Sequence, residues 1–508
     1  MTRAGIVADD LTGAADSAVQ FARAGWDARL ALGDEAVPEA RPDPDAAGPV
    51  TGADVPDAGG PVTGAAGAGA GVPAAGRSAV LAVVTDSRAL DASAAHDVTA
   101  AAVRDLVRRG VDRVLVKIDS TMRGSVAHQV SGALEAWRER HPQAFAVVSP
   151  AYPALGRTVE DGRLLVDGAG VETTSVGRDP VTPVTTSLLS DLLPGSAHVV
   201  VASGDARDLA LRLVEASAAG ADVVTVEAAT DADLVTTADA VRLLGARAVP
   251  VGSAGLAVAV SRAWAPEHEP AEGAAAPVPA HLVVVLSSLH DASRSQYEHL
   301  VRTAGEDAAP GQPGVRTVAP TLAEVLAGDL APALGRAEPT AADARDDRVV
   351  VVLAPPRAAP DGTAAPEATA ASGPTDAERV AEALAVLTER VVADLDDVGL
   401  VLVGGEGARA VLRRLGATAV RVRGAVREGV PHGTLEGGRL HGTPVVTKAG
   451  GFGPVTTLAD VVPVLLGRSD ASGATGAPAP PATATTAPAT MPAHATTAPT
   501  TTARGDRP

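Results

Sequence analysis

The sequence predicts an α/β protein of two domains, each with a mostly parallel sheet flanked by helices. Three observations support this fold class. Short runs rich in Val, Leu and Ala, bounded by Gly or polar residues, are typical of buried parallel strands. Amphipathic stretches that end at glycine lie between these runs and predict helical crossovers. A Pro-, Ala- and Glu-rich stretch at 266–279 predicts a linker, and 508 residues are enough for two or three domains.

The elements of the N-terminal half follow from these patterns in order. The first strand is expected at 5–8, and a helix at 12–24 is expected to stop at Gly25. Further strands are predicted at 80–84, 111–118, 144–148 and 198–202. Further helices are predicted at 96–109, which stops at Gly110, and at 205–218. These elements define a first domain at 1–265.

The C-terminal half repeats the alternation and defines a second domain at 280–468. Its predicted strands are 282–286, 349–353, 400–403, 419–422 and 444–446. Its predicted helices are 294–303, 376–394 and 408–415. Three segments rich in small residues, Pro or Thr have too few apolar side chains to offset ordering entropy, so we expect disordered insertions at 33–79 and 355–375 and a disordered tail at 469–508.

Composition excludes several classes of function. Without cysteine the chain can form no disulfide, thiolate metal site or cysteine nucleophile. A net charge of −19 without an extended basic stretch argues against nucleic acid as a partner. We expect a cytoplasmic protein with no membrane partner, because there is no signal-peptide pattern and no apolar run of about 18 residues.

Lysine is nearly absent from this sequence. Only Lys117 and Lys448 occur among 42 lysines and arginines, and both stand in dense motifs. Lysine is a compact, rotatable point charge, whereas arginine is a planar fork, so the two are not interchangeable at a site that meets a phosphoryl group. The two lysines therefore indicate two sites with specific chemical demands, although chance survival of surface lysines is the alternative.

Polar motifs follow three predicted strands of the N-terminal half. Asp9 and Asp10 follow the first strand, Arg88 follows the second, and 117–124 closes the third with Lys117, Asp119, Ser120 and Arg123. Ligands gather at the carboxyl ends of such strands. Helix capping by Asp10 and a surface ion pair for Arg88 are the alternatives. Together, cations, carboxylates and hydroxyls suit a small, polyhydroxylated, anionic ligand.

Glycine-rich turns follow two predicted strands of the C-terminal half. One is the Gly404-Gly405-Glu406-Gly407-Ala408 turn, and the other, at 448–453, begins with Lys448. Glycine permits close backbone approach and a helix N-terminus favours phosphate, although tight packing alone can explain such turns. Neither lysine stands in a P-loop pattern, and the dinucleotide fingerprint is missing.

In this order, the motifs resemble those of the four-carbon acid sugar kinases. The motifs concerned are 9–14, 86–88, 117–124, 252–257, 404–406 and 448–453. The resemblance implies an acid-sugar-binding domain at 1–265, a nucleotide-binding domain at 280–468, and ATP-dependent phosphorylation of a tetronate such as D-threonate, D-erythronate or 3-oxo-tetronate. Two positions depart from the family's usual sequence: Gly407 stands where it has Thr, and Ser287 where it has Gly. Both lie on the expected nucleotide side.

The resemblance also assigns roles to residues. The expected catalytic residues are Asp10, Lys117 and Asp119, and the sequence leaves open which carboxylate is the base. The expected substrate-binding residues are Asp9, Asp10, Arg88, Ser120, Arg123 and Gly124, with the two arginines on the substrate carboxylate. The expected ATP-binding residues are Ser288, Gly404, Gly405, Glu406, Gly407, Ala408, Lys448, Gly450, Gly451 and Gly453. Mg2+ is expected with ATP, without assigned protein ligands.

Two alternatives stay open. A dinucleotide-dependent oxidoreductase of hydroxy acids would act on similar molecules, although the missing fingerprint counts against it. A non-catalytic acid-sugar-binding homologue would keep the substrate pocket without turnover. Tetronate-dependent release of ADP would separate the kinase from both. The sequence fixes neither the stereoisomer nor the oligomeric state, for which a homodimer is one candidate.

Overall fold

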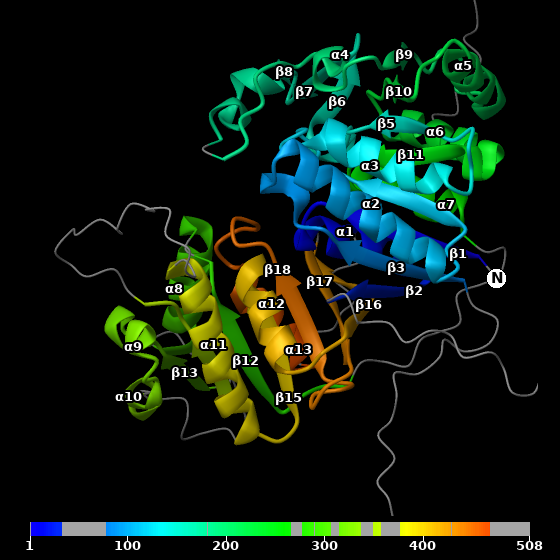
Figure 1. The fold of residues 1–508 in the computed structure, drawn as a ribbon. Coiled ribbons are helices and arrows are strands. Elements are labelled where there is room, and N and C mark those ends of the chain that lie inside the picture. Colours follow the sequence, from blue (N-terminus) through cyan, green and yellow to red (C-terminus); the bar gives the residue numbers. More distant parts are fainter. Residues whose placement is uncertain are drawn as a thin grey trace, which may run out of the picture. The chain divides into compact units, whose positions relative to one another are not determined.

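The computed structural model describes residues 2–32, 78–179, 181–265, 277–288, 290–305, 314–336, 349–356, 376–427 and 429–467. Within them, fifteen strands form one large sheet and three form a small sheet (Figure 1). The predicted α/β class is confirmed. The linker at 266–279 and the segments 33–79, 355–375 and 469–508 lie largely outside the described residues. Ala79 is described, and it begins a strand rather than ending an insertion.

Eight parallel strands form the N-terminal part of the large sheet, in the order β2-β3-β1-β4-β11-β5-β10-β9. Strands such as β1 and β5 are buried along almost their whole length, which explains their continuous apolar sequences. Their bounds are Arg3–Ala8 (β1), Asp27–Ala31 (β2), Ala79–Val84 (β3), Arg113–Lys117 (β4), Phe145–Ser149 (β5), Ala197–Val199 (β9), Val223–Val226 (β10) and Ala248–Gly252 (β11).

Helices cover both faces of these strands. They are α1 (Leu11–Arg23), α2 (Ala92–Arg108), α3 (Val126–Arg138), α5 (Ala206–Ala218), α6 (Asp231–Leu244) and α7 (Ala254–Ala263). Helices α5, α6, α7 and α1 pack in a row, while α2 packs against α3. Right-handed crossovers place that row on one face and α2 with α3 on the other.

A lobe of residues 153–192 is inserted after β5 (Figure 1). It contains the small antiparallel sheet of β6 (Arg157–Glu160), β7 (Arg163–Val166) and β8 (Ala169–Gly170). Short helical turns complete it: η3 (Pro153–Leu155), η4 (Val171–Thr173), η5 (Ser175–Arg178) and α4 (Leu189–Leu192). A bridge from Val159 to Ala228 joins the lobe to the segment after β10. No sequence pattern predicted this lobe.

The C-terminal part has five parallel strands in the order β13-β14-β12-β15-β18, followed by the antiparallel β17 and β16. The strands are β12 (His281–Leu286), β13 (Gly314–Val318), β14 (Val349–Leu353), β15 (Val398–Val403), β16 (Ala419–Arg427), β17 (Val430–Glu436) and β18 (Pro444–Lys448). The helices are α8 (Asp291–Gly305), α9 (Leu322–Ala327), α10 (Ala331–Gly335), α11 (Asp376–Ala393), α12 (Gly405–Arg414) and α13 (Thr457–Leu465). Helix α11 packs on α12, and α8 packs on α13.

The two sets of strands are continuous, which the sequence did not predict. Strand β2 pairs with β16 in antiparallel register, from Ala419 opposite Ala31 to Val422 opposite Ala28. Charged side chains strengthen this junction, because Asp27 accepts hydrogen bonds from Arg29 at 2.6 Å and from Arg421 at 2.9 Å. Both arginines are mostly buried.

The crossovers also show where a ligand site belongs. After β1 the chain crosses to one face of the sheet, where α1 lies. After the neighbouring strands β3 and β4 it crosses to the other face, where α2 and α3 lie. In the C-terminal part it leaves β12 for one face and its neighbour β15 for the other. Such switch points open a crevice at the carboxyl ends of the strands. Most of the polar and glycine-rich motifs singled out from the sequence follow strands at these points, and the turns at 252–257 and 448–453 follow β11 and β18 instead.

The parallel strands of the N-terminal part run in the opposite direction to those of the C-terminal part. The reason is that β2, β16, β17 and β18 are neighbours in this order and each is antiparallel to the next. Strand β16 has two register shifts against β17, and such bulges increase twist. The carboxyl ends of the two sets of strands nevertheless lie close together, because Arg409 of α12 forms an ion pair with Asp86, which follows β3. The strand ends of both parts therefore contribute to one region.

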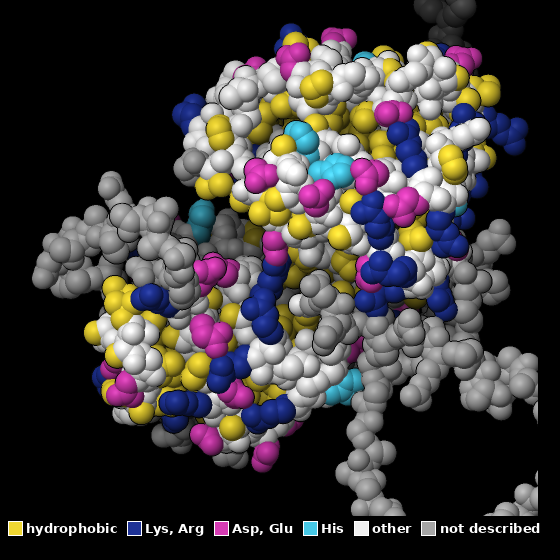
Figure 2. Space-filling view, viewed as in Figure 1, with side chains coloured by type: hydrophobic (Ala, Val, Ile, Leu, Met, Phe, Trp, Pro, Cys, Tyr) yellow, Lys and Arg dark blue, Asp and Glu magenta, His cyan; other side chains and the backbone are white. Residues whose placement is uncertain are grey.

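The helical surface carries charges of both signs. Figure 2 shows acidic and basic side chains interspersed over α2 and α3. Arg104 pairs there with Glu135 and Glu139 at 2.7 and 2.6 Å. No helix among the described residues is long and apolar enough to span a membrane.

Candidate active site

Arg88 is the centre of a cluster of carboxylates at the carboxyl ends of β1, β3 and β4. Its Nε donates to Asp9 Oδ2 at 2.7 Å, its Nη1 lies 2.8 Å from Asp10 Oδ2, and its Nη2 lies 3.6 Å from Asp119 Oδ2. Burial alone would lower the pKa of Arg88, but the three carboxylates raise it above its ordinary value. The whole guanidinium is thus engaged with protein carboxylates.

Asp9 is the most buried member of this cluster. Its side chain is 1% exposed, and its Oδ1 has no hydrogen-bond partner. Burial raises the pKa of Asp9, although the charges of Lys117 and Arg88 act in the opposite direction. A buried carboxylate oxygen without a partner is costly, so it is suited to accept a hydrogen bond from a ligand hydroxyl.

Asp119 is bound much more firmly. Its oxygens accept hydrogen bonds from Arg123 Nη2 at 2.8 Å, from the backbone of Thr121 at 2.9 Å, and from the Thr121 hydroxyl. Burial alone would raise the pKa of Asp119, but the hydrogen bond from Arg123 and the charge of Arg88 hold it well below its ordinary range. Asp119 therefore stays ionised and is a weak proton acceptor.

Lys117 lies at the end of β4, beside the first turn of α1. Its Nζ donates to the carbonyl of Ile118 at 2.8 Å, and the side chain is buried. Gly13 leaves room for it, because a Cβ at position 13 would stand 2.6 Å from Nζ. The position thus accepts a slender side chain ending in one charged atom.

Asp10 both caps a helix and belongs to the cluster of charged side chains, the two roles that the sequence left open. Its Oδ1 accepts a hydrogen bond from the backbone of Gly13 at 2.6 Å and so caps α1, while Oδ2 pairs with Arg88. Burial lowers the pKa of Arg409, although the nearby charge of Asp10 acts in the opposite direction. Capping alone explains Asp10 but not Asp9, which caps nothing.

The glycine turns of the C-terminal part meet α1 in a cavity that is partly open to solvent. Leu11, Thr12 and Ala15 of α1 line one side of this cavity. The remaining lining residues are Leu402, Gly404, Gly405, Ala408, Gly429, Pro431, Thr447, Lys448 and Ala449. Gly405 opens α12, whose N-terminal backbone N–H groups favour an anion.

Lys448 is buried under the loop that it begins. Its Nζ donates to the carbonyls of Ala449, Gly450 and Phe452 at 2.6, 3.3 and 2.7 Å. All three N–H bonds of the ammonium group are therefore used by the loop. This arrangement indicates that Lys448 shapes the 449–453 loop, and a phosphate would have to replace one of these carbonyls to bind it directly.

The buried position of Lys448 predicts a pH dependence of stability. Burial lowers the pKa of Lys448 from 10.5 to about 8. Between these values the unfolded chain binds more protons than the folded protein, so the free energy of unfolding should rise with pH from about 8 and be level below it. Denaturant unfolding at several pH values should show this rise for the wild type and not for Lys448→Met. Parallel curves for both proteins would contradict the pKa shift.

The two departures from the family's usual sequence are neighbours in the structure. A Cβ at Gly407 would overlap the Cβ and Oγ of Ser287. The Ser287 hydroxyl donates to the carbonyl of Val403 at 2.9 Å, next to the glycine turn. A side chain at position 407 and one at 287 thus exclude each other, so the two departures compensate sterically.

This compensation predicts strong coupling between the two positions. Gly407→Thr alone should destabilise the protein by about 1–3 kcal/mol, as overpacking does in other cores. Ser287→Gly with Gly407→Thr should recover most of that loss. Denaturant unfolding of the four proteins in a double-mutant cycle measures the coupling. Additive effects of the two substitutions would contradict the steric explanation.

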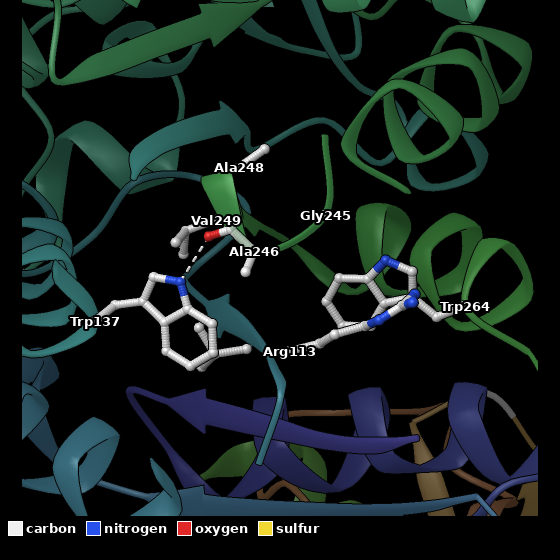
Figure 3. Close-up of a pocket in the computed structure, with 8 residues that line it drawn as sticks. Arg113, Trp137, Gly245, Ala246, Ala248, Val249 and Trp264 are labelled. Atoms are coloured by element: carbon white, nitrogen blue, oxygen red, sulfur yellow. Dashed lines mark hydrogen bonds between the residues drawn. The ribbon is translucent and has the colours of Figure 1, made fainter. Parts of the chain in front are cut away.

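A second cavity, also partly open to solvent, lies away from these groups (Figure 3). It opens at the amino ends of β4 and β11, between Trp137 and Trp264. The Trp137 indole donates to the carbonyl of Ala246 at 2.9 Å, and Arg113 lies 5.7 Å from the centre of the Trp264 ring. This cavity is a packing feature beneath the sheet.

The structure brings most of the predicted residues together. Asp9, Asp10, Arg88, Asp119 and Arg123 form one hydrogen-bonded cluster with Lys117 beside it. Four of the expected nucleotide-side residues line the cavity: Gly404, Gly405, Ala408 and Lys448.

Other predicted residues support the turns or are exposed. Gly124 packs against the backbone of Arg88, and a Cβ at Gly450 would overlap Ser288. A Cβ at Gly407 would likewise overlap Ser287, and a Cβ at Gly453 would overlap Thr457. A Cβ at Gly451 would contact His290. Ser120 is partly exposed, and Glu406 is exposed.

Two charged residues at this site were missed by the sequence analysis. Asp179, in the lobe, lies 3.2 Å from Arg123 Nη1. Arg409 forms its ion pair with Asp86. Neither stands in a motif, so no signal in a single sequence identifies them.

Fold and site together define a two-domain α/β protein with an acidic-basic cluster at the strand ends of one part and a glycine-lined cavity at those of the other. The sequence model described as the sugar-binding N-terminal domain matches residues 4–260. The model described as the nucleotide-binding C-terminal domain matches residues 283–458. The chain belongs to the four-carbon acid sugar kinase family.

Characterised relatives extend over most of the chain. A D-threonate kinase of Bordetella bronchiseptica is 41% identical over 450 residues, which cover 88% of this chain and 94% of that protein. A 3-oxo-tetronate kinase of Methylobacterium radiotolerans is 30% identical and covers 88% and 96%. A solved structure from Salmonella typhimurium has a TM-score of 0.64 at 20% identity, covering 91% of this chain and 99% of that one, and shows a likeness of fold.

Proposed function

We propose that the protein is an ATP-dependent kinase that phosphorylates a hydroxyl group of a four-carbon acid sugar. The observation that carries this proposal is the Asp9 carboxylate, whose Oδ1 is buried without a partner beside the cation of Lys117. Family membership supports the reaction class. The 41% identical relative is named a D-threonate kinase, which makes D-threonate the first substrate to test. A kinase that uses ATP is expected in the cytoplasm.

Asp9 is the carboxylate best suited to act as the base. Asp119 is ionised and fully engaged by Arg123 and Thr121, and Asp10 caps α1. Asp9 has a free oxygen, and burial raises its pKa, which brings a carboxylate closer to the range useful for proton transfer. As the substrate hydroxyl oxygen bonds to the γ-phosphorus, its proton would pass to Asp9 Oδ1 and the bond to ADP would break.

The nucleotide side of the proposal rests on the cavity. Gly404, with φ of 103°, packs closely against Ser287, whereas Gly405 leaves open space at the start of α12, where phosphate oxygens would meet backbone N–H groups. Phosphoryl transfer depends mainly on positioning and charge neutralisation. Lys117 would supply a fixed positive charge between the two parts of the site.

Mg2+ would enter with ATP and neutralise charge on the phosphates. Among the described residues, no group of three or more His, Cys, Asp or Glu side chains is arranged to hold a metal ion. This fits a cation held largely by phosphate oxygens and water, as Mg2+ commonly is in kinases. A homodimer stays a prediction that light scattering would test.

The decisive experiment combines purified full-length protein, ATP and Mg2+ with a panel of tetronates. Release of ADP coupled to a phosphorus resonance of a phosphorylated acid would support the kinase. An absorbance change of a nicotinamide cofactor with a hydroxy acid would instead support the oxidoreductase. Binding of a tetronate by calorimetry without any turnover would support a non-catalytic homologue.

A further inference from the structure

We propose that Asp179 competes with the substrate's carboxylate for Arg123, and thereby occupies the carboxylate position of the site until an acid sugar displaces it. This role rests on the proposed function, because it concerns how the same site recognises its substrate. The inference begins from a difference between Arg88 and Arg123. Both were expected to hold the substrate carboxylate, but only one of them has a partner that can leave.

Arg88 cannot readily exchange its partners. All three of its nitrogens face carboxylates of Asp9, Asp10 and Asp119, and its pKa is raised by them. Removing any of these contacts would leave a buried charge without compensation, which is strongly unfavourable. Arg88 is therefore a structural centre of the site and a poor anchor for an incoming acid.

Arg123 has two different partners. Its Nε and Nη2 face Asp119 in a bidentate contact, at 3.2 and 2.8 Å, and its Nη1 faces Asp179 Oδ2 at 3.2 Å. The Asp119 side chain is 9% exposed, whereas that of Asp179 is 21% exposed. Asp119 is also held by Thr121, so Asp179 is the partner that can move into water.

Asp179 can release Arg123 without losing its other hydrogen bonds. Its Oδ1 accepts from the backbone N–H groups of Val181 and Thr182 at 3.0 and 2.9 Å, and only Oδ2 faces Arg123. The backbone hydrogen bonds hold the pKa of Asp179 below its ordinary value, so it is charged at neutral pH. Displacement of Asp179 therefore breaks one partly buried contact.

The exchange also leaves Arg123 paired. The cluster holds the carboxylates of Asp9, Asp10, Asp119 and Asp179 against the cations of Arg88, Arg123 and Lys117. If a substrate carboxylate takes the place of Asp179 on Nη1, Arg123 keeps a carboxylate partner for its Nη1. A neutral polyol offers no such replacement, so it must bind beside an occupied Arg123 or leave that arginine unpaired.

Asp179→Asn tests this role directly. Asparagine keeps an oxygen for the backbone of Val181 and Thr182 but no longer attracts Arg123. The KM for D-threonate should fall, by about 10-fold if Asp179 occupies Arg123 for nine-tenths of the time, while kcat stays within about 2-fold. The ratio of kcat/KM for D-threonate to that for threitol, its neutral analogue, should rise by a similar factor, because threitol has no carboxylate that competes with Asp179.

Asp191→Asn is the matched control. Asp191 belongs to the same lobe and accepts a hydrogen bond from Thr186 at 3.1 Å, without a described contact to Arg123. Its KM and selectivity should equal those of the wild type. A rise in KM for Asp179→Asn alone would show that Asp179 only supports Arg123, and would overturn the proposal.

A fluorescent label can report the displacement itself. The chain has no cysteine, and the Val181 side chain, two residues from Asp179, is 69% exposed, so Val181→Cys gives a single labelling site. D-Threonate without ATP should change the label's emission, and threitol should not. No change at D-threonate concentrations that saturate the protein in calorimetry would overturn the proposal. If calorimetry shows that no tetronate binds, the proposed function fails and this role fails with it.

Discussion

Asp9→Asn should lower kcat by about 10³-fold, which corresponds to about 4 kcal/mol of transition-state stabilisation. Asp9 is the carboxylate with a free, buried oxygen and a raised pKa, and asparagine cannot accept the substrate proton. Asparagine is nearly isosteric, so its own oxygen can still face Arg88. Steady-state kinetics with D-threonate and ATP measure the loss, and thermal unfolding checks that the variant is folded.

Asp10→Asn is the matched control for this prediction. Asparagine caps helices as well as aspartate does, so α1 should keep its first turn, and only the contact with Arg88 is weakened. Its kcat should fall by about 10-fold or less. If Asp10→Asn were inactive and Asp9→Asn retained near wild-type kcat, the base would be Asp10.

The strand-end motifs could be predicted from the sequence because parallel strands place their carboxyl ends along one edge. Asp9, Arg88 and Asp119 lie far apart in the chain, yet β1 pairs with both β3 and β4, and this brings the three side chains together. The pattern of apolar runs fixes the type of sheet, and the type of sheet determines which loops are neighbours. The order of the strands was not needed for that inference.

The contacts made by single residues outside motifs could not be predicted. Strand β2 is only five residues long and carries Asp27 and Arg29, so its sequence shows no apolar run. Its role depends on pairing with β16, nearly 400 positions away. Asp179 and Arg409 reach the site from a lobe and a helix whose positions depend on that tertiary arrangement.

The sequence was informative about Lys448 but not about what its charge contacts. The rarity of lysine in this chain marked position 448 as one with a specific chemical requirement, and the structure places Lys448 in the wall of the cavity. Its three donors, however, are used by backbone carbonyls of its own loop. A motif shows which residue type is needed, whereas the partner of a rotatable side chain depends on the conformation of the loop.

Lys117→Arg should lower kcat by two orders of magnitude or more, about 2.7 kcal/mol, although it conserves charge. The Nζ of Lys117 lies 2.6 Å from where a Cβ on Gly13 would stand, and the side chain is buried, so the larger planar guanidinium has no space. Accommodating it would displace the first turn of α1, which carries Asp10 and lines the cavity. Kinetics measure kcat, and calorimetry with ATP separates lost catalysis from lost nucleotide binding.

Arg302→Lys, on an exposed face of α8, makes the reverse exchange and should change neither activity nor stability appreciably. Near wild-type kcat/KM in Lys117→Arg would show that the position requires only positive charge, and that the rarity of lysine here is a matter of composition.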